Sequence, residues 1–270
     1  MLKIINMDFR YANGHKVFGG MNLEIGENKI YGLLGKNGTG KSTLLYLISG
    51  LLTPQKGEVL FDSMNTRRRL PQTLSELFLV PDEFDFPPMT LVKYVKLYSP
   101  FYPNFSQEKL DECLKDFEVE DVKELTKLSL GQKKKVFVSF ALATGVKLLM
   151  MDEPTNGLDI PSKDAFRKIV AKHMGEGQTI IISTHLVHDV EPLLDHLLIM
   201  REDGTFYDRE TFDVTADYAF DYRTQAEGDD VVYAEPSPQG FAVIARNTGG
   251  RHTQINLDLL FKAVASGAVK

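Results

Sequence analysis

A glycine-rich stretch at positions 35–43, GKNGTGKST, has the residue types and spacing of a phosphate-binding loop. The apolar segment IYGLL precedes it and a segment of helical periodicity follows, as the pattern G-x-x-x-x-G-K-[ST] requires. Its glycines let successive backbone N–H groups face one anion, and the helix start adds the positive end of its dipole. A plain glycine turn before a helix is the alternative, but it does not explain the lysine and the serine. The predicted nucleotide-binding residues are Gly35, Lys36, Asn37, Gly38, Thr39, Gly40, Lys41, Ser42 and Thr43.

A pair of acidic residues ends a second apolar segment, LLMMDE (148–153). Strand alternation would turn Asp152 and Glu153 to different sides, which suits two tasks. We expect Asp152 to hold Mg²⁺ through a water or through Ser42, and Glu153 to polarise an attacking water. Alone, this pattern could equally be a strand end before a turn. Together with the glycine-rich loop it predicts nucleotide hydrolysis, because parallel strands present their carboxyl ends at one edge.

A histidine follows a third apolar segment, TIIIST, at position 185. Most histidines are structural or exposed. His185 differs because the end of this strand should lie near the terminal phosphate. There it could donate a hydrogen bond to that phosphate or hold the attacking water in place.

Composition and charge limit the function classes. The chain has 270 residues, 43% of them hydrophobic, and a net charge of −6, which argues against DNA as the main partner. Cys113 is the single cysteine, so an internal disulfide and a cysteine-based zinc cage are excluded. No signal pattern and no apolar run of about 20 residues occurs, so we expect a cytosolic chain that reaches a membrane only through another protein.

These residues need a scaffold of parallel strands that end at one edge. Continuous aliphatic runs predict buried parallel strands, whereas LKIINMDFRY and VFGGMNLEI predict shorter strands joined by tight turns. Roughly 90–125 is helical with a break at SPFYPNFS, and REDGTFYD predicts a hairpin. The residues after this hairpin predict further strands, in VVYAE and GFAVIAR, and a last helix around LDLLFKAVAS.

The segment KLSLGQKKK (127–135) places Ser129 before a helix whose first turn holds Gly131 and Gln132. Such a helix start is a second possible anion site. The lysines 133–135 point in different directions at about 100° per residue, so they cannot all face one ligand.

In this order, the motifs resemble the nucleotide-binding subunit of ABC transporters over about residues 1–205. LSLGQ stands at the signature position, GKNGTGKS at Walker A, LLMMDE at Walker B, GLD at the D-loop with Asp159, and His185 at the switch histidine. The resemblance implies that Tyr11 stacks on adenine, and that ATP and Mg²⁺ are the cofactors. It further implies that Ser129, Leu130, Gly131 and Gln132 contact the nucleotide of a partner subunit. Lysines 133–135 are then expected to be mostly a solvated or docking surface.

The implied fold is a P-loop NTPase of the α/β class. It has a mixed β core, an antiparallel β subdomain, an inserted helical subdomain at about 84–145 and a small α+β C-terminal appendage. The ATPase domain is expected over 1–207 and the appendage over 208–270.

Two departures from the family pattern concern the site. Leu130 replaces the first signature glycine, which disfavours a positive φ there. Asp82, in VPDE (80–83), stands at the position of the usual Q-loop glutamine and is expected to contribute an oxygen to Mg²⁺ or its water.

The implied function is ATP binding and hydrolysis as a head-to-tail homodimer or heterodimer. This pair drives a polytopic membrane permease, with export as the expected direction, from the inner face of the cell membrane. A soluble ABC ATPase acting on ribosomes or nucleic acid is the alternative. It usually has two ATPase units or a coiled-coil insertion, and this chain has one Walker A motif and no heptad run. A P-loop kinase would lack the signature.

Overall fold

The computed structural model describes residues 1–120 and 122–269. A six-stranded sheet in the order β10-β9-β3-β8-β7-β6 forms its centre. All its strands are parallel except β10, which pairs antiparallel with β9 in the predicted hairpin. The strands are β3 (Ile30–Leu34), β6 (Leu77–Val80), β7 (Leu148–Asp152), β8 (Thr179–Thr184), β9 (His196–Met200) and β10 (Phe206–Glu210).

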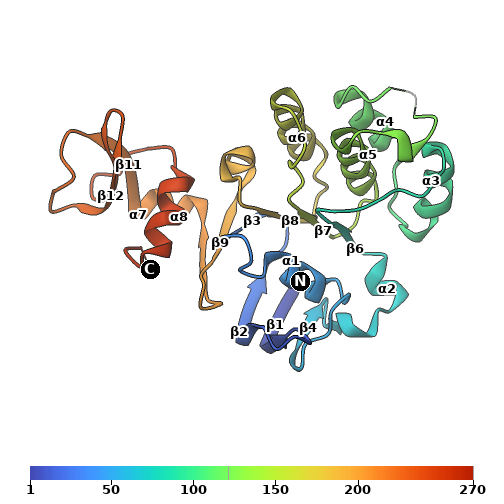
Figure 1. The fold of residues 1–270 in the computed structure, drawn as a ribbon, viewed down its shortest axis with the longest axis horizontal. Coiled ribbons are helices and arrows are strands. Elements are labelled where there is room, and N and C mark those ends of the chain that lie inside the picture. Colours follow the sequence, from blue (N-terminus) through green and yellow to red (C-terminus); the bar gives the residue numbers. More distant parts are fainter. Residues whose placement is uncertain (121, 270) are drawn as a thin grey trace.

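A second, antiparallel sheet of order β2-β1-β4-β5 lies below the central sheet in Figure 1, with α1 between the two. Its strands are β1 (Leu2–Arg10), β2 (Lys16–Ile25), β4 (Lys56–Phe61) and β5 (Met64–Asn65). The helices of the chain are α1 (Lys41–Ile48), α2 (Pro71–Leu74), α3 (Leu91–Tyr98), α4 (Gln107–Asp116), α5 (Leu130–Ala143), α6 (Ile160–His173), α7 (Thr211–Asp217) and α8 (Leu257–Ala265).

The central strands are buried on both faces, which explains their unbroken aliphatic sequences. Along β7, Leu148 and Met150 pack in the core shared with α1 and the antiparallel sheet. Leu149 and Met151 pack in the opposite core, shared with α5 and α6. Every residue of β3, β7 and β8 is buried. The central sheet therefore holds its strand ends rigidly, as a catalytic edge requires.

The helical subdomain occupies the right-hand side of Figure 1, where α3, α4 and α5 lie beside β6. The predicted helical stretch of about 90–125 consists of α3, a short 3-10 helix at Ser99–Phe101 and α4. Ser106 caps α4 by accepting a hydrogen bond from the Lys109 N–H. Residue 121 of that stretch lies outside the described residues.

The C-terminal appendage is a three-stranded antiparallel sheet, order β11-β13-β12, with α7 and α8 beside it at the left of Figure 1. Its strands are β11 (Tyr218–Arg223), β12 (Val231–Ser237) and β13 (Gly240–Arg246). The predicted boundary at 207/208 falls inside β10, a strand of the central sheet, so the chain leaves that sheet only after Glu210. The division into two domains stays a prediction.

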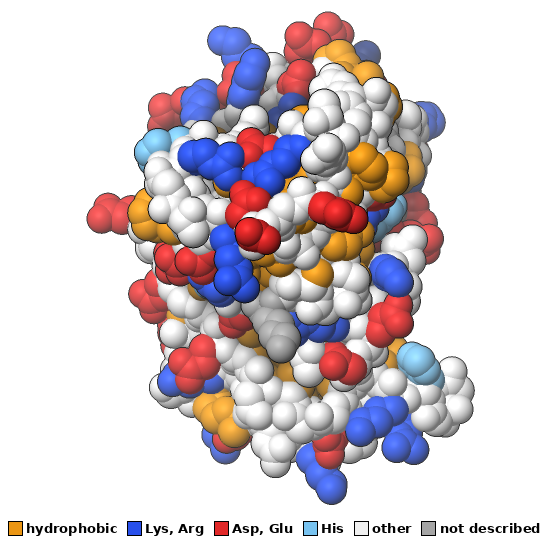
Figure 2. Space-filling view, turned by 90° about the vertical axis from the view of Figure 1, so that its left-hand side faces the viewer, with side chains coloured by type: hydrophobic (Ala, Val, Ile, Leu, Met, Phe, Trp, Pro, Cys, Tyr) orange, Lys and Arg blue, Asp and Glu red, His pale blue; other side chains and the backbone are white. Residues whose placement is uncertain are grey.

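Acidic and basic side chains are interspersed on the face that Figure 2 shows, which is the side of the appendage. In the part of the chain that the structure describes, none of the helices has the length and apolar character that crossing a bilayer demands. The predicted fold class, with its mixed core, antiparallel sheet, helical insertion and α+β appendage, is confirmed.

Candidate functional site

The glycine-rich loop joins β3 to α1, and Gly40 is the N-cap of α1. Gly38 has φ 82° and Gly40 has φ 108°, a region that residues with a side chain rarely adopt. A Cβ at Gly40 would also lie 2.4 Å from the Cγ1 of Val17. Two separate constraints thus require glycine at position 40.

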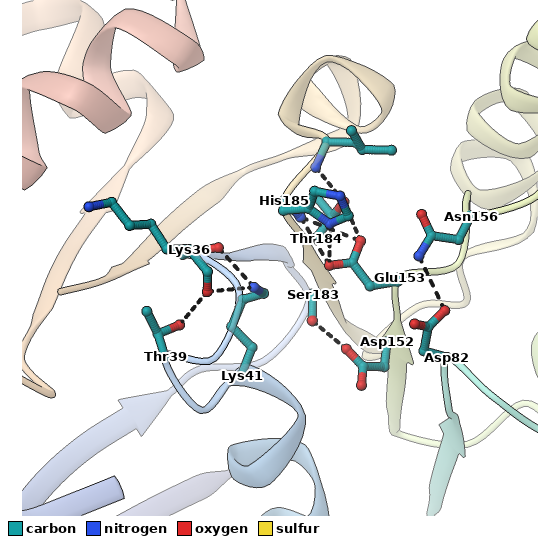
Figure 3. Close-up of polar contacts among 12 residues, drawn as sticks. Lys36, Thr39, Lys41, Asp82, Asp152, Glu153, Asn156, Ser183, Thr184 and His185 are labelled. Carbon is teal, nitrogen blue, oxygen red and sulfur yellow. Dashed lines mark hydrogen bonds and ion pairs between the residues drawn. The ribbon is translucent and has the colours of Figure 1, made fainter. Parts of the chain in front are cut away.

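The Lys41 ammonium lies over its own loop, 2.8 Å from the carbonyl oxygen of Gly35 and 3.2 Å from that of Lys36 (Figure 3). Burial lowers the pKa of Lys41, and the nearby carboxylates of Glu153 and Asp152 oppose this shift. A buried cation whose hydrogen bonds go to two carbonyl oxygens has capacity for a stronger acceptor. Phosphate is such an acceptor.

Asp152 and Glu153 reach two different neighbours at the end of β8. The Ser183 hydroxyl donates to Asp152 Oδ1 at 2.6 Å, and the Thr184 hydroxyl donates to Glu153 Oε2 at 2.9 Å (Figure 3). Glu153 has φ 45°, so its backbone leaves the strand conformation at this residue. The two side chains diverge because of this backbone turn rather than through continued strand alternation.

His185 contacts Glu153 with both its backbone and its ring. Its N–H donates to Glu153 Oε1 at 3.1 Å, and its Nδ1 lies 2.8 Å from the same oxygen. The glutamate side chain is mostly buried, whereas that of His185 is 37% exposed. The pair therefore presents an imidazole to solvent that is oriented by a buried carboxylate, an arrangement suited to proton handling.

A cavity of about 580 Å³ joins these parts. Its walls hold the predicted residues Tyr11, Asn37, Gly38, Gly40, Lys41, Ser42, Thr43, Asp82, Glu153 and His185. It also includes His15, Val17 and Asn156, which sequence reasoning missed. His15 lies in the turn between β1 and β2, and Asn156 in the turn after Pro154, so only the folded chain brings them here.

Tyr11 lies at the rim of this cavity. Its hydroxyl is 2.8 Å from Thr43 Oγ1, and its ring packs edge-on against Phe9 with centroids 5.0 Å apart. The ring is thus anchored to the start of α1 while 38% of the residue stays exposed. A partly exposed, fixed aromatic ring is suited to stacking on a planar base.

The signature residues lie away from this cavity, at the start of α5. Ser129 and Gln132 form a capping box: the Gln132 N–H donates to Ser129 Oγ at 3.3 Å, and the Ser129 N–H donates to Gln132 Oε1 at 3.1 Å. Leu130 is the first helical residue of α5, so its Cβ conflicts with no left-handed backbone. Leu130 instead packs on Gly157.

Close packing joins the signature to the D-loop. A Cβ at Gly131 would lie 2.8 Å from the Gly157 carbonyl oxygen, so the contact requires glycine. Asp159 caps α6 by accepting a hydrogen bond from the Ser162 N–H at 3.0 Å. Hydrogen bonds from Ser162 lower the pKa of Asp159.

The expectation that the three lysines of α5 are mostly solvated is wrong, and their role as a docking surface stays a prediction. Lys134 is buried, with a side chain 1% exposed, and its ammonium lies 3.3 Å from Asp82 Oδ1. Lys133 is half-buried and pairs with Asp85 at 3.0 Å, and Lys135 reaches the Phe117 carbonyl oxygen at 3.2 Å. α5 packs against the loop after β6 and against the end of α4, and this packing covers the aliphatic parts of the three lysine side chains. The local sequence pattern does not reveal this burial.

Asp82 faces the cavity but is held by two donors of its own chain. Besides Lys134, the Asn156 side-chain amide donates to Asp82 Oδ1 at 3.3 Å (Figure 3). Burial lowers the pKa of Lys134, and the charge of Asp82 is the main effect opposing that shift. The role of Asp82 toward Mg²⁺ stays a prediction.

This combination of a phosphate loop, a buried carboxylate pair at the end of β7 and a helical insertion defines a P-loop ATPase. The family model described as ABC transporter matches residues 18–156, more than half of the chain. The chain therefore belongs to the ABC transporter family, which confirms the resemblance found in the sequence. It is the ATP-binding, ATP-hydrolysing subunit.

Three known proteins illustrate the similarity. The lantibiotic transport ATP-binding protein SrtF of Streptococcus pyogenes is 28% identical over 216 residues, covering 78% of this chain and 91% of that protein. The energy-coupling factor transporter ATP-binding protein EcfA of Methanocaldococcus jannaschii is 33% identical over 204 residues, covering 71% and 72%. The dimeric post-hydrolysis structure of the ATP-binding cassette MJ0796, bound to ADP and Pi, has a TM-score of 0.68 at 26% identity, covering 78% and 98%.

Proposed function

We propose that this chain hydrolyses ATP in a head-to-tail pair, as a homodimer or with a second ATPase subunit, and that each reaction centre is completed by the partner. The single observation that carries this proposal is the place of Ser129. It lies at the exposed start of α5, and the cavity formed by Lys41, Ser42 and Glu153 does not include it. A capped helix start with free amide dipoles suits a phosphate brought by another subunit.

Within one subunit, we assign the roles from the contacts around the cavity. Lys41 and the loop amides bind the phosphates, Tyr11 stacks on the base, and Glu153 accepts the proton of the attacking water. His185, oriented by its contact with Glu153, faces the terminal phosphate. These assignments rest on the place of Lys41, Glu153 and His185 at the wall of one cavity and on the contacts between Glu153 and His185.

The residues present fit Mg²⁺ bound together with a nucleotide. The described residues hold no group of three or more acidic, histidine or cysteine side chains that could bind a metal by themselves. Mg²⁺ is commonly held by one or two carboxylates plus substrate phosphates, and Asp152, Ser42 and Asp82 offer such hard oxygens. When bound, the ion neutralises phosphate charge. Asp152 is kept in place for this task by the Ser183 hydroxyl.

Replacing Ser129 by arginine tests the pairing. We expect Ser129→Arg in a Glu153→Gln background to bind ATP normally but to stay monomeric, because the bulky side chain blocks the partner's phosphate. Turnover of the single variant should fall more than about tenfold. Light scattering with and without ATP measures the pairing, and a fluorescent ATP analogue measures monomer binding.

Two further variants separate pairing from stability. Ser129→Asp keeps an N-cap for α5 yet places a negative charge against the partner's phosphate, so it should also prevent pairing. Ser106→Arg removes the cap of α4 in the same subdomain and should leave pairing intact. ATP-dependent dimers of Ser129→Arg at wild-type affinity would overturn the head-to-tail arrangement.

A large apolar groove suits the membrane subunit. It has a volume of about 890 Å³ and lies between α2, β6 and the helical subdomain. Aromatic side chains dominate one wall, among them Tyr94, Tyr98 and Phe101, and Phe101 is 64% exposed. We propose that a short helix of a polytopic permease inserts its apolar side chains here. The chain would then work at the inner face of the cell membrane, and export is the direction we propose.

Phe101→Asp should abolish recovery of the permease with the tagged subunit from solubilised membranes, because a carboxylate in this groove loses apolar contact and is poorly solvated. The ATPase activity of the isolated subunit should stay unchanged. Phe212→Asp, which alters another exposed phenylalanine, on α7, is the matched control. Equal recovery of a polytopic protein with both variants would contradict docking at this groove, and recovery of ribosomes would favour the soluble alternative.

A further inference from the structure

Lys134 is a lysine outside the phosphate loop whose whole side chain is buried beside the nucleotide cavity. Its side chain is 1% exposed, whereas the other lysines of the same run, Lys133 and Lys135, are partly exposed. Lysine is rarely buried to this degree unless its charge is paired and its donors are satisfied. The burial of Lys134 therefore requires specific partners for its charge.

Three acceptors surround the ammonium of Lys134. The distances are 3.3 Å to Asp82 Oδ1, 3.5 Å to the Pro81 carbonyl oxygen and 3.2 Å to the Glu153 carbonyl oxygen. An ammonium has three N–H donors, so this set matches its capacity. The Phe84 ring closes the site, with its centroid 5.7 Å from the nitrogen. The cation thus joins the loop after β6 to the loop after β7.

The contact with Glu153 bears on the reaction because the Glu153 backbone is strained. Its φ of 45° is unfavourable for a residue with a side chain. Such a conformation persists only where several contacts impose it. The Glu153 N–H donates to the Ser183 carbonyl oxygen at 2.8 Å, and its own carbonyl accepts from the Asn156 N–H at 3.2 Å and from Lys134. Lys134 therefore helps to set the direction of the catalytic carboxylate.

The same contacts close a hydrogen-bonded ring. Lys134 reaches Asp82 and the Glu153 carbonyl, and Asn156 reaches the same two groups through its side chain and its backbone N–H. Asp82, Asn156 and Glu153 all line the nucleotide cavity, whereas Lys134 belongs to α5. Ser129 begins that same helix. One side chain thus connects the helix start that serves a partner to the residues that serve this subunit's own nucleotide.

We propose that Lys134 is a positioning residue for ATP hydrolysis, which holds the Glu153 main chain and the Asp82 carboxylate in place and ties both to α5. This inference rests on the proposed function, since it takes Glu153 as the base and Ser129 as the contact to the partner's nucleotide. Lys134 acts through these groups and does not itself touch the nucleotide.

The experiment compares kcat, KM for MgATP and the dissociation constant of a fluorescent ATP analogue across variants. Lys134→Met should lower kcat at least about tenfold and change analogue binding less than about threefold, because the phosphate loop is intact. Lys135→Met removes a neighbouring lysine of the same helix and should leave kcat within about twofold. Thermal unfolding of both variants shows whether stability explains the difference.

A double-mutant cycle that removes each charge in turn tests the ion pair between Lys134 and Asp82. Lys134→Gln leaves the Asp82 carboxylate without its cation, and Asp82→Asn leaves the buried ammonium of Lys134 without its carboxylate, so each alone should lower kcat by about tenfold. The double variant replaces the ion pair by a neutral amide pair that still has a donor for the Glu153 carbonyl. It should recover to within about threefold of the wild-type kcat. If Lys134→Met does not fold, this cycle still tests the role of Lys134.

Two results would overturn the inference: a kcat for Lys134→Met equal to that of Lys135→Met, or a double variant whose loss equals the product of the single losses. Failure of the proposed function looks different, because Lys41→Ala or Glu153→Gln would then keep turnover. If those two variants lose activity while the cycle is additive, only the role of Lys134 is rejected.

Discussion

Replacing Glu153 by glutamine is expected to lower ATP turnover about a thousandfold, which corresponds to roughly 4 kcal/mol of barrier. The substitution keeps the size of the side chain and an oxygen that can accept from the His185 N–H, but an amide cannot accept the proton of the attacking water. The Thr184 hydroxyl can turn to accept from the new amide, so the local structure should persist. Because binding is retained and hydrolysis is not, ATP-bound dimers should accumulate.

Phosphate release under saturating ATP measures this loss, and light scattering measures the dimers. Glu83→Gln is the control, since Glu83 is an exposed carboxylate on the loop that carries Asp82 and does not line the cavity. It should leave turnover unchanged. A Glu153→Gln variant with turnover within about threefold of the wild type, under 1 kcal/mol of barrier, would show that another group is the base.

Lys41→Ala is expected to weaken ATP binding at least about a hundredfold, close to 3 kcal/mol. The lysine is the cation aimed into the phosphate loop, and hydrogen bonds between charged groups are the strongest of their kind. Its ammonium is already desolvated over the Gly35 and Lys36 carbonyls, so exchange of these neutral acceptors for phosphate oxygens strengthens its contacts.

Calorimetric titration with MgATP measures the affinity, and circular dichroism checks the fold. Lys56→Ala removes an exposed lysine of β4 and should bind as the wild type does, which excludes a general effect of net charge. Unchanged affinity in Lys41→Ala would contradict the assignment of the phosphate loop. A variant that binds weakly but unfolds at the wild-type temperature would support it most clearly.

Much of the molecule could be predicted because its signals are local. The glycines at positions 38 and 40 have the positive φ values that the loop pattern implies. Ser106 and Ser129 cap the helices that follow them, through hydrogen bonds to residues three positions later. Such contacts span one turn of chain, so residue type and spacing alone reveal them.

Residue types and their spacing were enough to predict the family, the phosphate loop, the acidic strand end and the histidine that follows the neighbouring strand, because each depends on short-range geometry. The burial of Lys134 and the ring of contacts among Lys134, Asp82, Asn156 and Glu153 are evident only in the folded chain, whereas the family resemblance already implied that the signature serves a partner's nucleotide. The cause is the distance between these residues along the chain. Lys134 meets Asp82 across 52 residues and Glu153 across 19, and burial of a charge depends on such remote partners rather than on its neighbours in sequence.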